Sequence, residues 1–333
     1  MLFIDNQGIT DPSVNLAIEE YALKHLPADE SYLLFYINRP SIIIGKHQNT
    51  VEEINNEYVR DNNIQVVRRL SGGGAVYHDL GNLNFSFITK DDGESFHNFQ
   101  KFTQPVIEAL HKMGVNAEMT GRNDLQVGEQ KISGNAQFAT RGRMFTHGTL
   151  MFNLNLDHVQ AALNANPEKF KSKSTKSVRS RVANIRDLMD TKMTIEEFRA
   201  ELLRSIFSME ASEVPQYELT EKDWEKINQI SEERYKLWDW NYGQSPASNI
   251  KQSKKFPVGI IDIRMDIKDG LIEEIKIYGD FFGVGDVADL EDALRGKRFE
   301  EHAVREALAD MDVKHYFGNL EKDDLIGLIL LDQ

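Results

Sequence analysis

The most informative stretch of the sequence is Arg68-Arg69-Leu70-Ser71-Gly72-Gly73-Gly74-Ala75-Val76-Tyr77-His78-Asp79. Consecutive glycines are costly to order, so they are expected where the chain adopts unusual dihedral angles or where a ligand approaches the backbone. Exposed N–H groups in such a loop, together with the adjacent arginines, favour binding of an anion such as phosphate. The alternative is a flexible hairpin loop with two surface arginines. The glycine spacing fits neither a Walker A loop nor a dinucleotide-binding fingerprint.

Short runs of β-branched and aromatic residues surround this loop and are typical of strands. They are Tyr32–Ile37, Ser41–Ile44, Gln65–Val67, Leu83–Thr89, Asp124–Val127, Lys131–Ala139 and Phe145–Leu154. An amphipathic pattern predicts a helix over Phe96–Met113, and a capping-box pattern at Thr194–Glu197 predicts the start of another. Because the strands adjoin without regular helical crossovers, the sequence predicts an α+β fold with a mixed or largely antiparallel sheet.

A change of composition near residue 243 predicts two domains. We expect a large domain over residues 1–243, a linker over residues 244–255 that is rich in small, polar and lysine residues, and a small domain over residues 256–333. In the small domain, apolar and charged residues alternate from Ile261 to Ile267, and Asp269-Gly270 then turns the chain. This pattern predicts a β-hairpin, and the helical patterns that follow complete a small α+β accessory domain.

The composition narrows the class of protein. The chain has 333 residues, 39 basic and 53 acidic side chains, and therefore a net charge of −14. This acidic balance disfavours broad binding to nucleic acid or to anionic membranes. There is no cysteine, which excludes a disulfide scaffold, a thiolate metal site and a cysteine nucleophile. No signal-like leader and no apolar run of membrane-spanning length occurs, so the sequence predicts a cytoplasmic protein.

Two further positions combine a functional side chain with nearby glycines. Lys131 stands between Gly128 and Gly134, where its ammonium group is able to enter a cleft and neutralise an anion; the alternative is a solvated lysine on a hairpin. Asp124 is suited to hold a hydrated Mg²⁺ through one carboxylate oxygen, as is usual for nucleotide-bound magnesium. His147 lies beside a glycine in a predicted strand, where a structural role is the more common one.

A local reversal of charge follows these strands. Residues 169–186 carry seven basic side chains and no acidic one, with serine and threonine residues between them. Hydroxyl and cationic donors in one segment suit a lid over a nucleotide. The alternative is a solvated basic loop.

Taken together, six motifs in this order resemble the bacterial lipoate-protein ligase A family over nearly the whole chain. They are the glycine-rich stretch of residues 68–79, Gly121-Arg122-Asn123-Asp124, Lys131-Ile132-Ser133-Gly134, His147-Gly148-Thr149-Leu150, Ser177-Val178-Arg179-Ser180-Arg181-Val182 and Trp240-Asn241-Tyr242-Gly243-Gln244.

The resemblance implies a catalytic domain of the biotin/lipoate ligase fold and a small C-terminal accessory domain. It also implies a reaction in two steps. Lipoate and ATP first give lipoyl-AMP and pyrophosphate, and an acceptor lysine then attacks the activated carbonyl to form an amide. The implied acceptors are apo lipoyl domains of the E2 subunits of 2-oxoacid dehydrogenase complexes and the glycine-cleavage H protein.

The resemblance also implies roles for individual residues. The catalytic lysine, which contacts both the nucleotide phosphate and the lipoyl carbonyl, falls on Lys131, and the magnesium contact falls on Asp124. The remaining positions fall into three groups: for ATP and the adenylate, Arg69, Gly74, Ala75, Val76 and Tyr77; for lipoate, Arg69, Ser71 and His147; and for the loop that closes over the adenylate, Lys173, Ser177, Arg179 and Arg181. Val76, Phe85, Phe87 and Leu150 are candidates for the apolar slot, with ordinary core as the alternative.

Two other functions stay open from the sequence. The same fold is used by lipoyl and octanoyl transferases, and the absence of cysteine leaves only a transferase that does not use a cysteine nucleophile. A protein that binds lipoate or lipoyl domains without catalysis is the other alternative. Pyrophosphate exchange into ATP that depends on lipoate separates the ligase from such a binder, which shows none.

Overall fold

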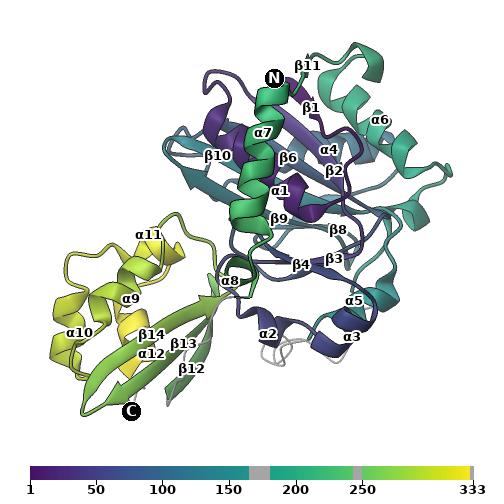
Figure 1. Cartoon of the computed structure of the whole chain (residues 1–333). Helices are drawn as coiled ribbons and strands as arrows, with labels where there is room; N and C mark the ends of the chain where they lie inside the picture. Colours follow the sequence, from purple (N-terminus) through teal and green to yellow (C-terminus); the bar gives the residue numbers. More distant parts are fainter. Residues whose placement is uncertain (165–180, 243–249, 331–333) are drawn as a thin grey trace.

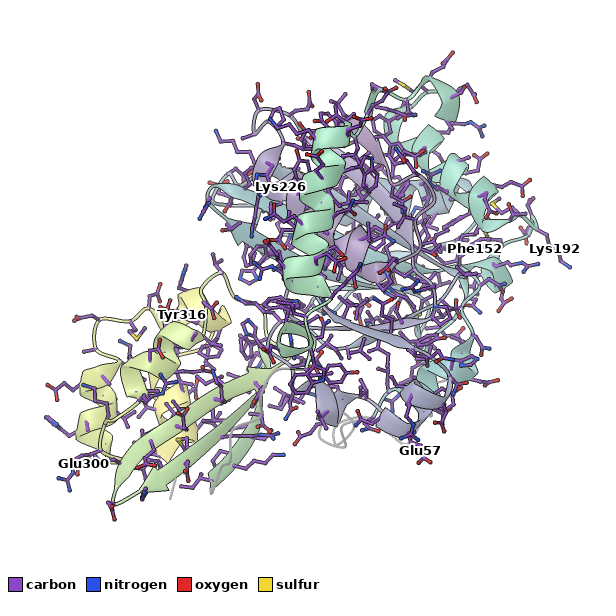
Figure 2. The ribbon with its side chains drawn as sticks, viewed as in Figure 1. Glu57, Phe152, Lys192, Lys226, Glu300 and Tyr316 are labelled. Atoms are coloured by element: carbon purple, nitrogen blue, oxygen red, sulfur yellow. The ribbon has the colours of Figure 1, made fainter. Side chains whose placement is uncertain are left out.

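A computed structural model describes residues 1–164, 181–242 and 250–330. Within these ranges the chain forms a large unit up to residue 242 and a small unit from residue 250, which lies beside it (Figure 1). Side chains fill the space between sheets and helices in both units (Figure 2). In the large unit Phe152 is buried, whereas Lys192 and Lys226 are exposed at its surface. No described helix has the length and apolar character needed to cross a bilayer.

Two sheets form the large unit within the described residues. The first has the strand order β11–β1–β2–β6–β10–β9–β8–β7, in which β1 pairs parallel with β2 and β11 and the other neighbours are antiparallel. The second has the order β4–β3–β5, with one parallel and one antiparallel pair. The strands are β1 (Leu2–Asp5), β2 (Tyr32–Ile37), β3 (Ser41–Ile44), β4 (Gln65–Arg68), β5 (Val76–His78), β6 (Asn82–Lys90), β7 (Glu118–Thr120), β8 (Asp124–Val127), β9 (Gln130–Thr140), β10 (Arg143–Met151) and β11 (Gln216–Tyr217). The predicted α+β class with a mixed sheet is confirmed.

Helices cover both faces of the large sheet. On one face lie α1 (Pro12–His25) and α7 (Glu221–Ile230), which pack side by side, and on the other lie α4 (Phe99–Lys112) and α6 (Ile195–Phe207) (Figure 1). The predicted capping box at the start of α6 is present, since the Thr194 side chain accepts from the Glu197 N–H and the Glu197 side chain accepts from the Thr194 N–H. The shorter elements are α2 (Thr50–Glu53), α3 (Asn56–Asp61), α5 (Leu156–Ala162), η3 (Ile185–Leu188), η4 (Ala211–Glu213), η5 (Ser231–Tyr235) and α8 (Trp238–Asn241).

Alternation along β6 decides what each face of the large sheet carries. Leu83, Phe85 and Phe87 point to the side of α4 and α6 and belong to one apolar core. Asn84 and Ser86 therefore point to the side of α1, because successive side chains of a strand face opposite sides of the sheet. This second face is partly polar, and it is the face that carries the site described below.

Strand β10 ends earlier than the sequence predicts. The expected strand runs to Leu154, whereas β10 ends at Met151. The N–H groups of Phe152 and Asn153 both donate to the carbonyl of Gly81, at 3.1 and 2.8 Å, so the chain turns away from the ladder there. Apolar side chains continue past the end of the strand because they still enter the core.

The small unit is an antiparallel sheet of β12 (Ile250–Phe256), β13 (Gly259–Lys268) and β14 (Leu271–Gly279), packed against helices. These helices are α9 (Ala288–Leu294), α10 (Glu301–Ala307), α11 (Val313–Phe317) and α12 (Lys322–Leu330). The predicted hairpin is present, and Asp269 and Gly270 take the positive φ angles, 50° and 76°, that a two-residue turn of this kind needs. In the return strand the alternation of apolar residues breaks at Glu273, where the register shifts opposite Asp266 and Ile267.

One part of the predicted linker is wrong. Residues 250–255 were expected to connect the domains, but they form most of β12, paired antiparallel with β13. β12 lies at the edge of its sheet, and exposed lysines are common on edge strands because they discourage pairing with other chains. The polar, lysine-rich composition that suggested a linker belongs to this largely exposed edge strand.

Candidate active site

A pocket lies on the α1 face of the large sheet, beneath the second sheet and the glycine-rich loop. Strands β2, β6, β10 and β9 supply one wall, and β3, β5 and the loop before β5 supply the other. The lining residues are Leu16, Tyr36, Ile43, Arg69, Gly73, Gly74, Ala75, Val76, His78, Asn84, Asn123, Lys131, Gly134, Asn135, Ala136, His147, Gly148, Thr149 and Phe282. The pocket thus brings together most of the residues that the sequence selected.

Arg69 organises the glycine-rich loop from inside. Its guanidinium group donates to Ser71 Oγ at 3.0 Å, to the Ile43 carbonyl at 3.1 Å, and to the carbonyls of Gly72 and Gly74 at 2.7 and 2.9 Å. Arg69 is 5% exposed, and burial lowers the pKa of its guanidinium to about 10, so it stays charged at neutral pH. The planar fork of arginine donors suits several carbonyls at once, and Arg69 therefore fixes the loop that borders the pocket.

A buried chain of hydrogen bonds connects this loop to α1. Ser71 Oγ lies 2.7 Å from His147 Nε2, and His147 Nδ1 lies 2.9 Å from Glu19 Oε1. Because a carboxylate only accepts, Nδ1 donates to Glu19, and Nε2 shares a hydrogen bond with the Ser71 hydroxyl. Ser71 has no exposed surface, so this serine, histidine and glutamate hold the loop in place and do not present a nucleophile.

Lys131 lies at the other side of the pocket, near the start of β9. Its Nζ is 2.8 Å from Asp124 Oδ1, and both side chains are about one-third exposed. A Cβ on Gly134 would lie 2.9 Å from Lys131 Nζ, so the glycine leaves the space that the lysine occupies. The Lys131 N–H donates to the Arg181 carbonyl at 2.8 Å, and the Ala183 N–H donates to the Lys131 carbonyl at 3.0 Å. Lys131 is therefore anchored by backbone pairing while its ammonium group remains accessible.

The predicted site residues fall into three groups. Arg69, Gly74, Ala75, Val76, Lys131 and His147 line the pocket. Ser71 lies just behind it, and the Tyr77 side chain points away and stacks on His158 with ring centroids 6.0 Å apart. Arg181 reaches the site through its carbonyl, and Lys173, Ser177 and Arg179 lie outside the described residues.

Three of the four residues suggested for an apolar slot are core residues. Phe85, Phe87 and Leu150 belong to the buried cluster on the opposite face of the sheet, and only Val76 lines the pocket. The alternation of a strand predicts two faces without saying which one a ligand uses. The pocket face carries Asn84 and Thr149 in place of the large apolar neighbours.

The small unit contributes to the pocket, which the sequence did not indicate. Phe282 is 3% exposed, lines the pocket and packs against Phe99 with ring centroids 5.8 Å apart. The guanidinium of Arg122 lies 4.5 Å from the centre of the Phe282 ring, a favourable cation–π contact, and donates to the Val258 carbonyl. These contacts hold the small unit, which is the accessory domain, at the rim of the pocket.

The sequence gave no role to three other side chains at the site. Glu19 and Tyr36 come from α1 and β2, which the sequence does not bring near the loop, whereas His78 lies within the glycine-rich stretch of residues 68–79 itself. The strongest available signal was the pair of adjacent glutamates, Glu19 and Glu20, within the otherwise apolar pattern of α1; both are buried. A charged residue on a buried helix face usually has a partner, although its identity depends on the tertiary fold.

The site offers a magnesium ion few protein ligands. No group of three or more metal-ligating side chains occurs in the described part of the chain. Mg²⁺ in nucleotide sites is commonly held by one or two carboxylates, with phosphate oxygens and water as the other ligands. The carboxylate of Asp124, next to Lys131, satisfies that requirement.

Known proteins resemble the chain over its full length. A model of the lipoyl protein ligase A/B catalytic domain matches residues 11–207, and a model of the bacterial lipoate protein ligase C-terminus matches residues 245–329. Lipoate-protein ligase LplJ of Bacillus subtilis is 63% identical, covering 99% of this chain and 100% of the relative. Lipoate–protein ligase 1 of Staphylococcus aureus is 58% identical, with the same coverage.

Solved structures agree. A lipoate protein ligase of Thermoplasma acidophilum with bound lipoic acid is 29% identical, with a TM-score of 0.62 over 74% of this chain and 98% of that one. A lipoate-protein ligase A bound with ATP is 28% identical, with a TM-score of 0.61 over 73% of this chain and 97% of that one. The fold, the cationic pocket and these matches define a ligase enzyme with a catalytic and an accessory domain. Specifically, the chain belongs to the lipoate-protein ligase family.

Proposed function

We propose that this ligase activates free lipoate with ATP and transfers the lipoyl group to a lysine of an apo lipoyl domain. The observation that carries the proposal is one pocket with two kinds of lining. Lys131 and the loop held by Arg69 supply positive charge and backbone donors, whereas Leu16, Ile43 and Val76 supply an apolar wall. A carboxylic acid with an apolar tail and a polyphosphate need this combination.

In the first step a carboxylate oxygen of lipoate attacks the α-phosphorus of ATP, and the bond to pyrophosphate breaks. Both reactants are negative, so their mutual repulsion has to be neutralised before they meet. Lys131 provides a point charge at this position, and its pairing with Asp124 holds the ammonium group in place. When bound, Mg²⁺ supplies further neutralisation of phosphate charge, held by Asp124.

In the second step the ε-amine of the acceptor lysine attacks the carbonyl carbon of lipoyl-AMP. The bond to the AMP oxygen breaks, the amide forms, and the amine loses a proton. Lys131 polarises the carbonyl during this attack, since an ammonium stabilises the developing negative charge on oxygen. Water has to be excluded because it competes with the amine for the activated acyl group.

The proposed acceptors are the lipoyl domains of E2 subunits and the glycine-cleavage H protein. A solved structure of an archaeal lipoylation system contains a bi-partite lipoate protein ligase, 31% identical to this chain, and its E2 lipoyl domain. This relative supports the kind of partner. A reaction that consumes ATP belongs in the compartment that supplies it, so the proposal places the enzyme in the cytoplasm.

The first step is tested by exchange of labelled pyrophosphate into ATP, which should depend on lipoate. We expect Lys131→Ala to lower this exchange at least a hundredfold, because a charge aimed at the transition state contributes about 3 kcal/mol. Lys226→Ala is the matched control, since Lys226 is an exposed lysine of α7 outside the pocket. Exchange by Lys131→Ala within threefold of wild type refutes the assigned role, and no exchange by the wild type refutes the ligase reaction.

A further inference from the structure

The pocket has a second end, remote from Lys131. Lys131 lies on β9, and Tyr36 lies on β2, three strands away in the order β2–β6–β10–β9. At about 4.8 Å per strand, the two positions are about 14 Å apart across the sheet. His78 lines the pocket and is hydrogen-bonded to Asn38, which directly follows β2. His78 therefore lies at the end that the tail of a carboxylic acid reaches when its carboxylate is at Lys131.

A chain of buried amides fixes which nitrogen of His78 carries the proton. Asn15 Nδ2 lies 3.0 Å from the Ile9 carbonyl and 3.3 Å from the Ile37 carbonyl, and carbonyls only accept, so this nitrogen is a donor. Its two hydrogens are shared between these carbonyls and Asn38 Oδ1, which lies 2.9 Å away and therefore accepts. Asn38 consequently turns its NH₂ group to His78 Nδ1, at 3.0 Å. Nδ1 accepts, and the proton of the neutral ring is on Nε2.

His78 is neutral, and its second nitrogen has no partner in the part of the chain that the structure describes. The residue is 3% exposed, and burial lowers the pKa of its ring to about 3. Nε2 is fully buried and has no hydrogen-bond partner among the described residues. Leaving a buried donor unpaired is costly, so an N–H in this position marks a place where a ligand atom accepts.

The amide of Asn84, another polar group of this end, is already engaged. Asn84 accepts from Asn82 Nδ2 at 2.9 Å and donates to the Tyr36 carbonyl at 3.1 Å. Among the described residues that line the pocket, the other buried polar atom without a partner is Asn135 Oδ1, an acceptor on β9. At the end remote from Lys131, the Nε2–H of His78 is thus a spare donor, and the Tyr36 hydroxyl is a further polar group.

We propose that His78 is a specificity-determining residue, whose Nε2–H donates to a sulfur of the dithiolane ring of lipoate and so favours lipoate over octanoate. The inference rests on the proposed function and adds the basis on which this site selects its acid. Sulfur is a weak acceptor, but a saturated chain offers none, so octanoate leaves the buried donor unpaired. The site therefore selects a sulfur-containing tail by one hydrogen bond and binds the rest of the acyl chain by apolar contact.

The test compares equilibrium binding of lipoate and of octanoate, measured by calorimetry without ATP. We expect His78→Phe to lower the ratio of lipoate affinity to octanoate affinity by about fivefold to tenfold, mainly through weaker lipoate binding. His47→Phe is the matched control, because His47 is also a buried neutral histidine but does not line the pocket. Its affinity ratio should equal that of the wild type.

A second measurement uses the unmodified protein, so it does not depend on how the variant folds. Proton–nitrogen NMR of histidine labelled with ¹⁵N should show His78 protonated on Nε2, and addition of lipoate, but not of octanoate, should shift this N–H signal. If His78→Phe leaves the ratio of lipoate affinity to octanoate affinity unchanged, or if the proton is on Nδ1, the inference is wrong. Lipoate-dependent exchange by the wild type would then still support the proposed function. Failure of the wild type to bind lipoate or to catalyse exchange overturns the proposed function instead.

Discussion

Replacing Arg69 by lysine separates the charge of this residue from its geometry. Both side chains are cationic, but the four hydrogen bonds of Arg69 reach four different acceptors in the glycine-rich loop and in β3. A lysine ammonium is compact, sits on a flexible stem, and cannot span these positions. We expect Arg69→Lys to keep the local charge and to lose the order of the loop.

The magnitude follows from the acceptors that lose their donor. Arg69 is 5% exposed, so at least two of its four acceptors stay buried and unpaired when lysine takes its place. A buried unpaired polar group costs about 1–3 kcal/mol, which gives a loss of about 3 kcal/mol in the free energy of unfolding. Most domains have about 5–15 kcal/mol in total, so the variant should still fold.

Urea unfolding followed by tryptophan fluorescence measures this loss of unfolding free energy in the large unit, which contains Arg69. All three tryptophans, Trp224, Trp238 and Trp240, belong to the large unit. Arg60→Lys is the matched control, because Arg60 is 74% exposed and pairs with Asp61 at the surface. The free energy of unfolding of this variant should differ from that of the wild type by less than about 0.5 kcal/mol. If Arg69→Lys also loses less than about 1 kcal/mol, the hydrogen bonds of Arg69 do not hold the loop and our reasoning is wrong.

Three further outcomes are expected. Burial lowers the ring pKa of His47 and of His78 to about 3, whereas the unfolded chain protonates histidine near 6.5. Below that pH only the unfolded state gains protons, so stability should fall by about 2 kcal/mol per histidine between pH 6.5 and 5, and His47→Phe should show a shallower fall in urea titrations at each pH. Glu19→Gln removes the carboxylate that accepts from the ring of His147 and should cost about 1–2 kcal/mol of unfolding free energy, whereas Glu57→Gln, at an exposed site, should cost nothing measurable. Thr194→Ala removes the N-cap of α6 and should lower the urea midpoint by an amount equal to about 1 kcal/mol.

Local sequence was sufficient for several strands and for the loop, but β1, β5, β7 and β11 were not predicted. Tyr32–Ile37, Ser41–Ile44 and Asp124–Val127 agree with β2, β3 and β8 at both ends, because β-branched and aromatic residues fill these runs and turn residues bound them. The costs of ordering glycine and of leaving charge unpaired are also local properties. These properties predicted that Arg69 and Lys131 belong to an anion-binding site, and the structure brings both to the same pocket.

Long-range pairing was not available from the sequence. Glu19 and His147 are 128 positions apart, and their contact depends on how α1 lies across β10. The choice of Phe85 and Leu150 for an apolar slot failed for a related reason, since a strand pattern does not state which face meets a ligand. The sequence of β12 misled in the opposite direction, because an exposed edge strand and a polar linker have similar compositions.

The glycines of the loop serve the accessory unit as well as the pocket. A Cβ on Gly72 would lie 2.2 Å from the Phe281 carbonyl oxygen, and one on Gly73 would lie 2.8 Å from the Phe282 ring. The Gly73 N–H donates to the Phe281 carbonyl at 3.3 Å. If the loop binds nucleotide phosphate through this N–H, the same hydrogen cannot serve both partners. Nucleotide binding at Gly73 and docking of the accessory unit then compete, and each must weaken the other by the same free energy.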